Sequence, residues 1–135
     1  MQPAAPAPAA GSLLERLEIE ARAKDQADPP TSKVMQALQA AKLAMAEPHQ
    51  QSGASVGARY CVSVAAEEHV TLRICEFPSA QEALAGRERS LATFKEIAGV
   101  RVELKRSTLL AVIDSQGDVK SGAVTKRALS AFDAL

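Results

Sequence analysis

Two cysteines, Cys61 and Cys75, are the side chains of this sequence whose type and spacing most clearly predict a covalent interaction. Apolar and polar residues alternate around each of them, and the polar segment Glu67–His69 separates the two runs. Such alternation predicts two β-strands joined as a hairpin. Pairing Ala66 with Val70 sets the cysteines directly opposite each other, where α-carbons are about 4.5–5.5 Å apart and a disulfide can form. We therefore predict a Cys61–Cys75 disulfide, which indicates an oxidising compartment.

Three interpretations of the cysteine pair stay open: a structural disulfide, two unpaired thiols and a redox-active dithiol. The structural disulfide is favoured, because a bridge that closes a loop of about 15 residues contributes roughly 3 kcal/mol to a small domain. A dithiol catalyst more often carries Cys-x-x-Cys at the start of a helix, where the helix dipole lowers the thiol pKa. That spacing does not occur in this sequence.

No metal or cofactor site is expected. The two histidines, His49 and His69, would have to converge with the cysteines to form a four-ligand site. His69 falls in the hairpin turn, however, roughly 17–20 Å along the strand from Cys61. Asp114 and Asp118 resemble a fragment of a calcium loop, but the other acidic ligands at the required spacing are missing, so we expect a turn there.

Carboxylates do not form a recognisable catalytic pattern. Glu76, Glu82 and Glu103 could supply a hydrolytic pair only if the fold brought two of them together, which the sequence does not show. The sequence contains no nucleophile elbow and no phosphate-binding loop. We therefore expect a protein that is not an enzyme.

The remaining patterns predict an α+β fold. Ser79–Glu82 has capping-box spacing and begins a helix of about five turns. Residues 100–105 and 108–113 alternate as a second hairpin, with Leu104 opposite Leu109, and a final helix runs to the end of the chain. The result is a four-stranded antiparallel sheet from two hairpins in a β-β-α-β-β-α order. We expect the two later helices on one face and an N-terminal helix over the cysteines.

The chain divides into three segments. Residues 1–11 form a Pro/Ala-rich disordered tether. Residues 12–57 contain one or two N-terminal helices and a loop over residues 49–57. Residues 58–135 form the compact α+β domain, where the aromatic residues are concentrated.

Composition argues against a nucleic-acid partner. Among 135 residues, 16 basic side chains balance 16 acidic ones, so the chain lacks the positive surface of a nucleic-acid binder. The pairs Lys105-Arg106 and Lys126-Arg127 are small basic clusters that we expect to be solvated surface.

The segment Gln2–Gly11 resembles the stretch that follows the lipidated cysteine in mature bacterial lipoproteins, with Met1 standing where that cysteine would be. With the α+β domain and the cysteine hairpin, the chain resembles small uncharacterised bacterial periplasmic lipoproteins. The resemblance implies a periplasmic or outer-envelope location and membrane attachment through a lipid that this chain does not carry. An ordinary disordered terminus and an interdomain linker are the alternatives.

The leading functional hypothesis is a non-enzymatic binding or protein-interaction module of the bacterial cell envelope, with an unknown protein partner that contacts the sheet or the N-terminal helices. The first alternative is a small apolar-ligand carrier with a pocket between Leu91, Phe94, Phe132 and the sheet. The second alternative is a thiol-disulfide redox protein that uses Cys61 and Cys75.

Overall fold

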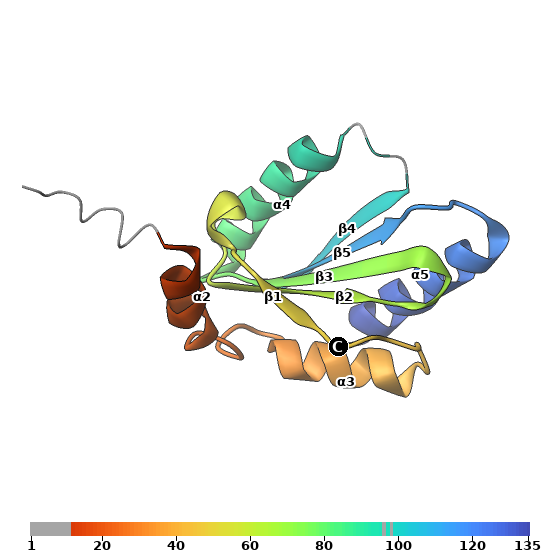
Figure 1. The fold of residues 1–135 in the computed structure, drawn as a ribbon, viewed down its shortest axis with the longest axis horizontal. Helices are drawn as coiled ribbons and strands as arrows, with labels where there is room; N and C mark the ends of the chain where they lie inside the picture. Colours follow the sequence, from red (N-terminus) through yellow and green to blue (C-terminus); the bar gives the residue numbers. More distant parts are fainter. Residues whose placement is uncertain (1–11, 96, 98) are drawn as a thin grey trace, which may run out of the picture.

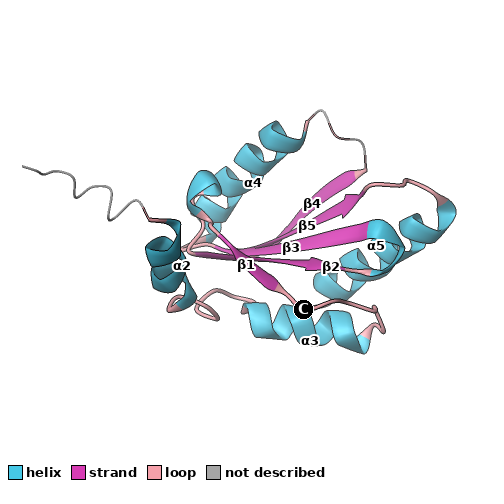
Figure 2. Cartoon of the chain, viewed as in Figure 1, coloured by secondary structure: helices cyan, strands magenta, loops and turns pink. Residues whose placement is uncertain are grey.

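The computed structural model describes residues 12–95, 97 and 99–135, so the predicted tether at residues 1–11 lies outside the described residues. The fold combines helices with one antiparallel sheet and is α+β (Figure 2). Its elements in chain order are α2 (Leu13–Ala21), α3 (Thr31–Ala40), β1 (His49–Gln51), η1 (Ala54–Val56), β2 (Tyr60–Ala65), η2 (Glu67–His69), β3 (Val70–Glu76), α4 (Ala80–Phe94), β4 (Val100–Lys105), β5 (Thr108–Asp114) and α5 (Val119–Asp133).

The sheet has five strands in the order β1-β2-β3-β5-β4, rather than the four strands predicted from sequence. The additional strand, β1, lies in the segment that was expected to be a loop. It has three residues, all polar, and therefore shows no alternation of residue types. Its pairing with β2 in the folded chain, with Gln50 opposite Val62, defines it as an edge strand.

Both predicted hairpin registers are confirmed. In the first hairpin, Cys61 is opposite Cys75 and Val62 is opposite Ile74. In the second hairpin, the predicted Leu104–Leu109 pair is present, and so are the pairs Val102–Ala111 and Val100–Ile113. A shift of one residue would have moved every side chain to the other face, so the apolar pattern sets both registers.

Buried side chains form one cluster on each face of the sheet. Figure 1 shows the helices that cover these faces. The first cluster joins the sheet to α3 and α5 and consists of Val34, Leu38, Leu43, Tyr60, Val62, Val64, Val70, Leu72, Ile74, Leu110, Val112, Val124, Ala128 and Phe132. The second cluster joins the sheet to η1 and α4 and consists of Val56, Cys61, Cys75, Phe77, Ala83, Val102, Leu109 and Ala111. The domain therefore has three layers.

The predicted distribution of helices over the two faces is wrong. The helix that covers the cysteines is α4, whereas α3 shares the opposite face with α5. Strand β5 is buried over the run Leu109–Val112, so both faces need a cover. Phe77 lies three residues before the start of α4 and is already part of the cysteine-side cluster, so the chain enters α4 on this face. A Cβ at Gly86 would clash with the Phe77 ring, so glycine permits this close approach.

Among the described residues, no helix combines the length and the apolar character that a membrane crossing requires.

A buried carboxylate at the end of β3 organises the chain before α3. Glu76 is fully buried. Its Oε1 accepts hydrogen bonds from the backbone N–H groups of Gln26 at 3.2 Å and Ala27 at 3.3 Å. Its Oε2 accepts from the N–H of Asp25 at 3.0 Å, and from both the N–H and the hydroxyl of Thr31 at 2.7 and 2.5 Å. The polar groups of this segment are thus satisfied inside the protein.

The same segment also binds the turn between β4 and β5. The carbonyl of Asp28 accepts a hydrogen bond from the Ser107 N–H at 2.9 Å, and its carboxylate pairs with Arg106 at 2.8 Å. The Thr108 hydroxyl donates to the carbonyl of Pro29. Together with Glu76, these bonds join the residues before α3 to β3 and to the second hairpin.

Glu76→Gln is expected to lower the free energy of unfolding by about 2–3 kcal/mol, because it removes the charge and leaves buried N–H donors without an acceptor. The matched control is Glu103→Gln on the exposed surface of β4, which should change stability by no more than about 0.5 kcal/mol. Urea denaturation of both variants measures the difference. Equal effects of the two substitutions would contradict the role given to Glu76.

Candidate functional site

The predicted cysteine pair is bonded in the structure. The two sulfur atoms are 2.07 Å apart, and the α-carbons of Cys61 and Cys75 are 4.1 Å apart. Both residues are buried, with exposed fractions of 0% and 1%, among apolar side chains that include Val56, Phe77 and Ala83. The bridge thus lies inside the core between the sheet and α4.

This burial limits what the bridge can do chemically. Thiol–disulfide exchange requires an attacking thiolate to reach one of the sulfur atoms. Because Cys61 and Cys75 are enclosed by α4 and η1, a thiolate could reach them only after that layer opened. The geometry therefore favours a structural staple between β2 and β3 over a redox centre.

The three residues predicted to line an apolar pocket do not share one cavity. Leu91 packs against the cysteine-side cluster, and Phe94 lies half-buried on the same helix. Phe132 is 1% exposed and belongs to the cluster on the other face of the sheet. It borders a groove of about 230 Å³ beside β4, with Arg101 and Glu103 among the other lining residues. The sheet separates this groove from Leu91.

The candidate metal ligands are also dispersed. His49 lies in β1 and His69 in the first hairpin turn. Within the part of the chain that the structure describes, no group of three or more His, Cys, Asp or Glu side chains is placed to hold a metal ion.

The loop that resembles a calcium-loop fragment caps α5 instead. The carboxylate of Asp118 accepts a hydrogen bond from the Ser121 N–H at 2.8 Å and forms a capping box. This bond, followed by the bond from the Ser121 hydroxyl, holds the pKa of Asp118 below its usual range. Asp114 accepts from the Gly117 N–H at 2.8 Å, and this bond is the main cause that lowers the pKa of Asp114. Both carboxylates therefore stabilise the turn that starts the helix.

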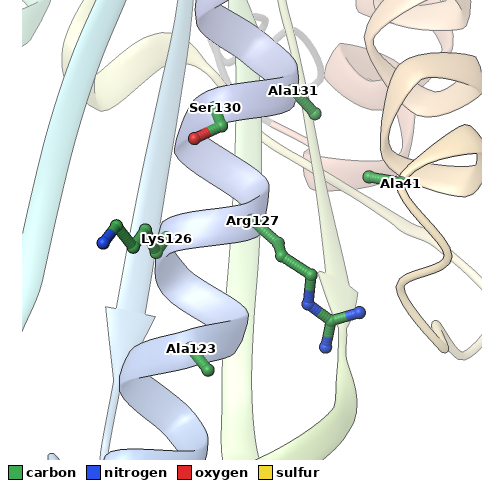
Figure 3. Close-up of a pocket in the computed structure, with 6 residues that line it drawn as sticks. All are labelled: Ala41, Ala123, Lys126, Arg127, Ser130 and Ala131. Carbon is green, nitrogen blue, oxygen red and sulfur yellow. The ribbon is translucent and has the colours of Figure 1, made fainter.

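A mainly apolar groove runs beside α5 at the point where α3 ends, and we call it the α3–α5 groove (Figure 3). Its volume is about 660 Å³, and its lining residues are Ala41, Ala123, Lys126, Arg127, Ser130 and Ala131. Four of these six side chains are Ala or Ser, so little side-chain bulk separates the groove from the two helix backbones. A partner helix could therefore approach closely.

Arg127 is held at one side of the α3–α5 groove. It donates to the Lys42 carbonyl at 3.4 Å and to the Glu67 carboxylate at 3.2 Å. The hydrogen bond from the Ala44 N–H, and then the charge of Arg127, lower the pKa of Glu67. Figure 3 shows Arg127 and Lys126 leaving α5 in different directions. Lys126 is exposed, so the groove carries a positive rim.

Sequence reasoning treated Lys126-Arg127 as solvated surface and missed the groove beside it. A weak signal was present, because Ala123 and Ser130 are small residues on the part of the final helix that its apolar stripe leaves outside the core, whereas Ala131 belongs to the stripe and packs against the core from the edge of the groove. These α5 residues lie beside Ala41 only because α3 packs against α5. The packing of two helices that are distant in the sequence cannot be predicted from a local residue pattern.

No family model, curated protein or solved structure matches this chain.

The double variant Cys61→Ala/Cys75→Ala is expected to be folded but less stable by about 3 kcal/mol, because removing the bridge restores freedom to a loop of about 15 residues in the unfolded chain. Urea denaturation measures the loss, and alkylation of the unfolded wild type without reductant, read by intact mass, should find both thiols protected. A double variant as stable as the wild type would contradict the structural role.

Proposed function

We propose that this protein is a non-enzymatic protein-interaction module of the bacterial cell envelope, and that its docking surface is the α3–α5 groove. The observation that carries the proposal is the combination of an open groove of about 660 Å³, small side chains along it and a basic rim. The occupant is an amphipathic helix of a partner protein that places a carboxylate against Lys126. Helix-in-groove docking is a common mode of protein recognition.

Shape and charge support this occupant together. Ala123 and Ser130 are exposed and small, which allows a second helix to lie close to α5. Beyond them, Val119 is 90% exposed and offers an apolar contact at the start of α5. A carboxylate on the partner near Lys126 would add electrostatic complementarity, which sets orientation and association rate more than affinity.

The disulfide and the resemblance to lipoproteins support the envelope location. A buried structural bridge such as Cys61–Cys75 forms and persists in oxidising compartments. The Pro/Ala segment at residues 2–11 has the composition of an extended tether that could hold the domain away from a membrane. Native protein recovered from the cytosol with both thiols free would contradict this part of the proposal.

The second candidate function is a small apolar-ligand carrier that uses the same groove. A volume of about 660 Å³ is within the range of about 300–1,000 Å³ that ligand pockets occupy. The groove is open to solvent rather than enclosed, however, and an open apolar surface suits a helix better than a small molecule that must be buried on most sides. A redox function of Cys61 and Cys75 is supported less, since both are buried.

A photo-crosslinking residue at Ala123 is expected to form an adduct with a single partner protein in cells that express the full-length protein. The same crosslinker at Leu84, which is 59% exposed on α4, is the control and should form none. Lys126→Glu should reduce the Ala123 adduct by about tenfold, because an attractive contact with a carboxylate becomes repulsive.

Two results would oppose the docking proposal. Equal yields of adduct at Ala123 and Leu84 would show that the partner protein does not bind preferentially at the groove. Binding of a fluorescent apolar probe that Ala123→Trp abolishes, without any protein adduct at Ala123, would favour the ligand carrier instead.

A further inference from the structure

A row of polar side chains crosses the sheet on the face that carries the disulfide. His49 of β1 is opposite Ser63 of β2, and Ser63 is opposite Arg73 of β3. Residues directly opposite each other in neighbouring strands point to the same side of the sheet, so these three side chains lie next to one another. Cys61 and Cys75 are two residues away along the same strands and share this face.

The disulfide end of this face is covered, and the other end is open. Helix α4 packs against β4 and β5 (Figure 1). Cys61 and Cys75 are buried, whereas Ser63 and Arg73 are half-buried and Ala65 is exposed. The polar row of His49, Ser63 and Arg73 therefore lies at the edge of the α4 layer, where the sheet becomes accessible to solvent.

Arg73 is a cation without a described counter-charge. Its Nε is buried and has no hydrogen-bond partner, and no ion pair joins it to any residue that the structure describes. Burial lowers the pKa of Arg73, which means that the surroundings disfavour the charged form. A guanidinium nevertheless stays protonated in proteins. A partly desolvated charge of this kind is stabilised when an anion binds to it.

We propose that Arg73, Ser63 and His49 form a binding site for an oxyanion, the carboxylate or phosphate group of a small molecule. Because Nε is buried, the two terminal Nη groups of the planar guanidinium are the donors that can form two parallel hydrogen bonds with either group. The Ser63 hydroxyl and the His49 imidazole supply further donors beside it.

The surface next to the row has space for the rest of such a ligand. A hollow of about 560 Å³ begins two residues further along β2 and β3, at Ala65 and Thr71, and Ser115 also lines it. Glu68 and His69 lie in the same lining, at the hairpin turn. This site is on the face of the sheet opposite the α3–α5 groove, so it is independent of the proposed docking function.

The test is NMR of the full chain, following the side-chain Nε–H resonances of the arginines during separate titrations with sodium phosphate and sodium acetate, at ionic strength matched with sodium chloride. The Arg73 resonance should shift and saturate with phosphate, acetate or both. Saturation with phosphate alone would assign the site to phosphate groups, and saturation with acetate alone would assign it to carboxylates. The resonance of Arg101, which is exposed on the other face, is the internal control and should not saturate.

Arg73→Gln should weaken the saturating anion by about tenfold to a hundredfold, the effect of losing charge-assisted hydrogen bonds. Backbone amide shifts of Ser63 and Thr71 report binding in this variant. The matched variant Arg101→Gln should leave the affinity unchanged. If the Arg73 resonance of the wild type moves no more than that of Arg101 with both anions, the site does not exist, and this result needs no variant to fold.

Discussion

The architecture depends on the carboxylate of Glu76, which is buried at the end of a strand and accepts five hydrogen bonds from the segment before α3 and from the first residue of that helix. A buried carboxylate without such donors would strongly destabilise the fold. The backbone donors of Asp25–Ala27 and Thr31 would in turn be unsatisfied without it. Glu76 directly follows Cys75, so the disulfide that joins β2 to β3 also restrains the strand that presents the carboxylate.

The α3–α5 groove is a consequence of this anchoring. Because Glu76 holds Thr31, the first residue of α3, it determines where that helix begins over the sheet. Val34 and Leu38 are then fully buried against the same face as α5. The two helices lie next to each other, and Ala41 at the end of α3 forms the groove together with the outer surface of α5. A proposed interaction surface on one side of the protein thus depends on a buried polar contact at the end of β3.

The features predicted correctly from the sequence are those that neighbouring residues determine, namely the hairpin registers and the disulfide. Alternation around Cys61 and Cys75 was sufficient for the hairpin register and the disulfide, whereas β1 was missed because three polar residues carry no alternation. The helix layers were misassigned because apolar stripes do not say which face a helix covers. The α3–α5 groove and the Arg73 row depend on contacts between distant segments. One signal was readable: Glu76 continues the apolar positions 70, 72 and 74 of its strand.

Native-state hydrogen exchange of the backbone amides that bind Glu76 tests most directly whether this carboxylate joins the segment before α3 to the sheet. If it does, the N–H groups of Gln26 and Thr31 exchange with the same opening free energy as the amides of Leu72 and Ile74 in the central strand, because they open only when the domain unfolds. Rapid exchange of Gln26 and Thr31 while the amides of β3 stay protected would show that the segment opens independently, and would contradict the account.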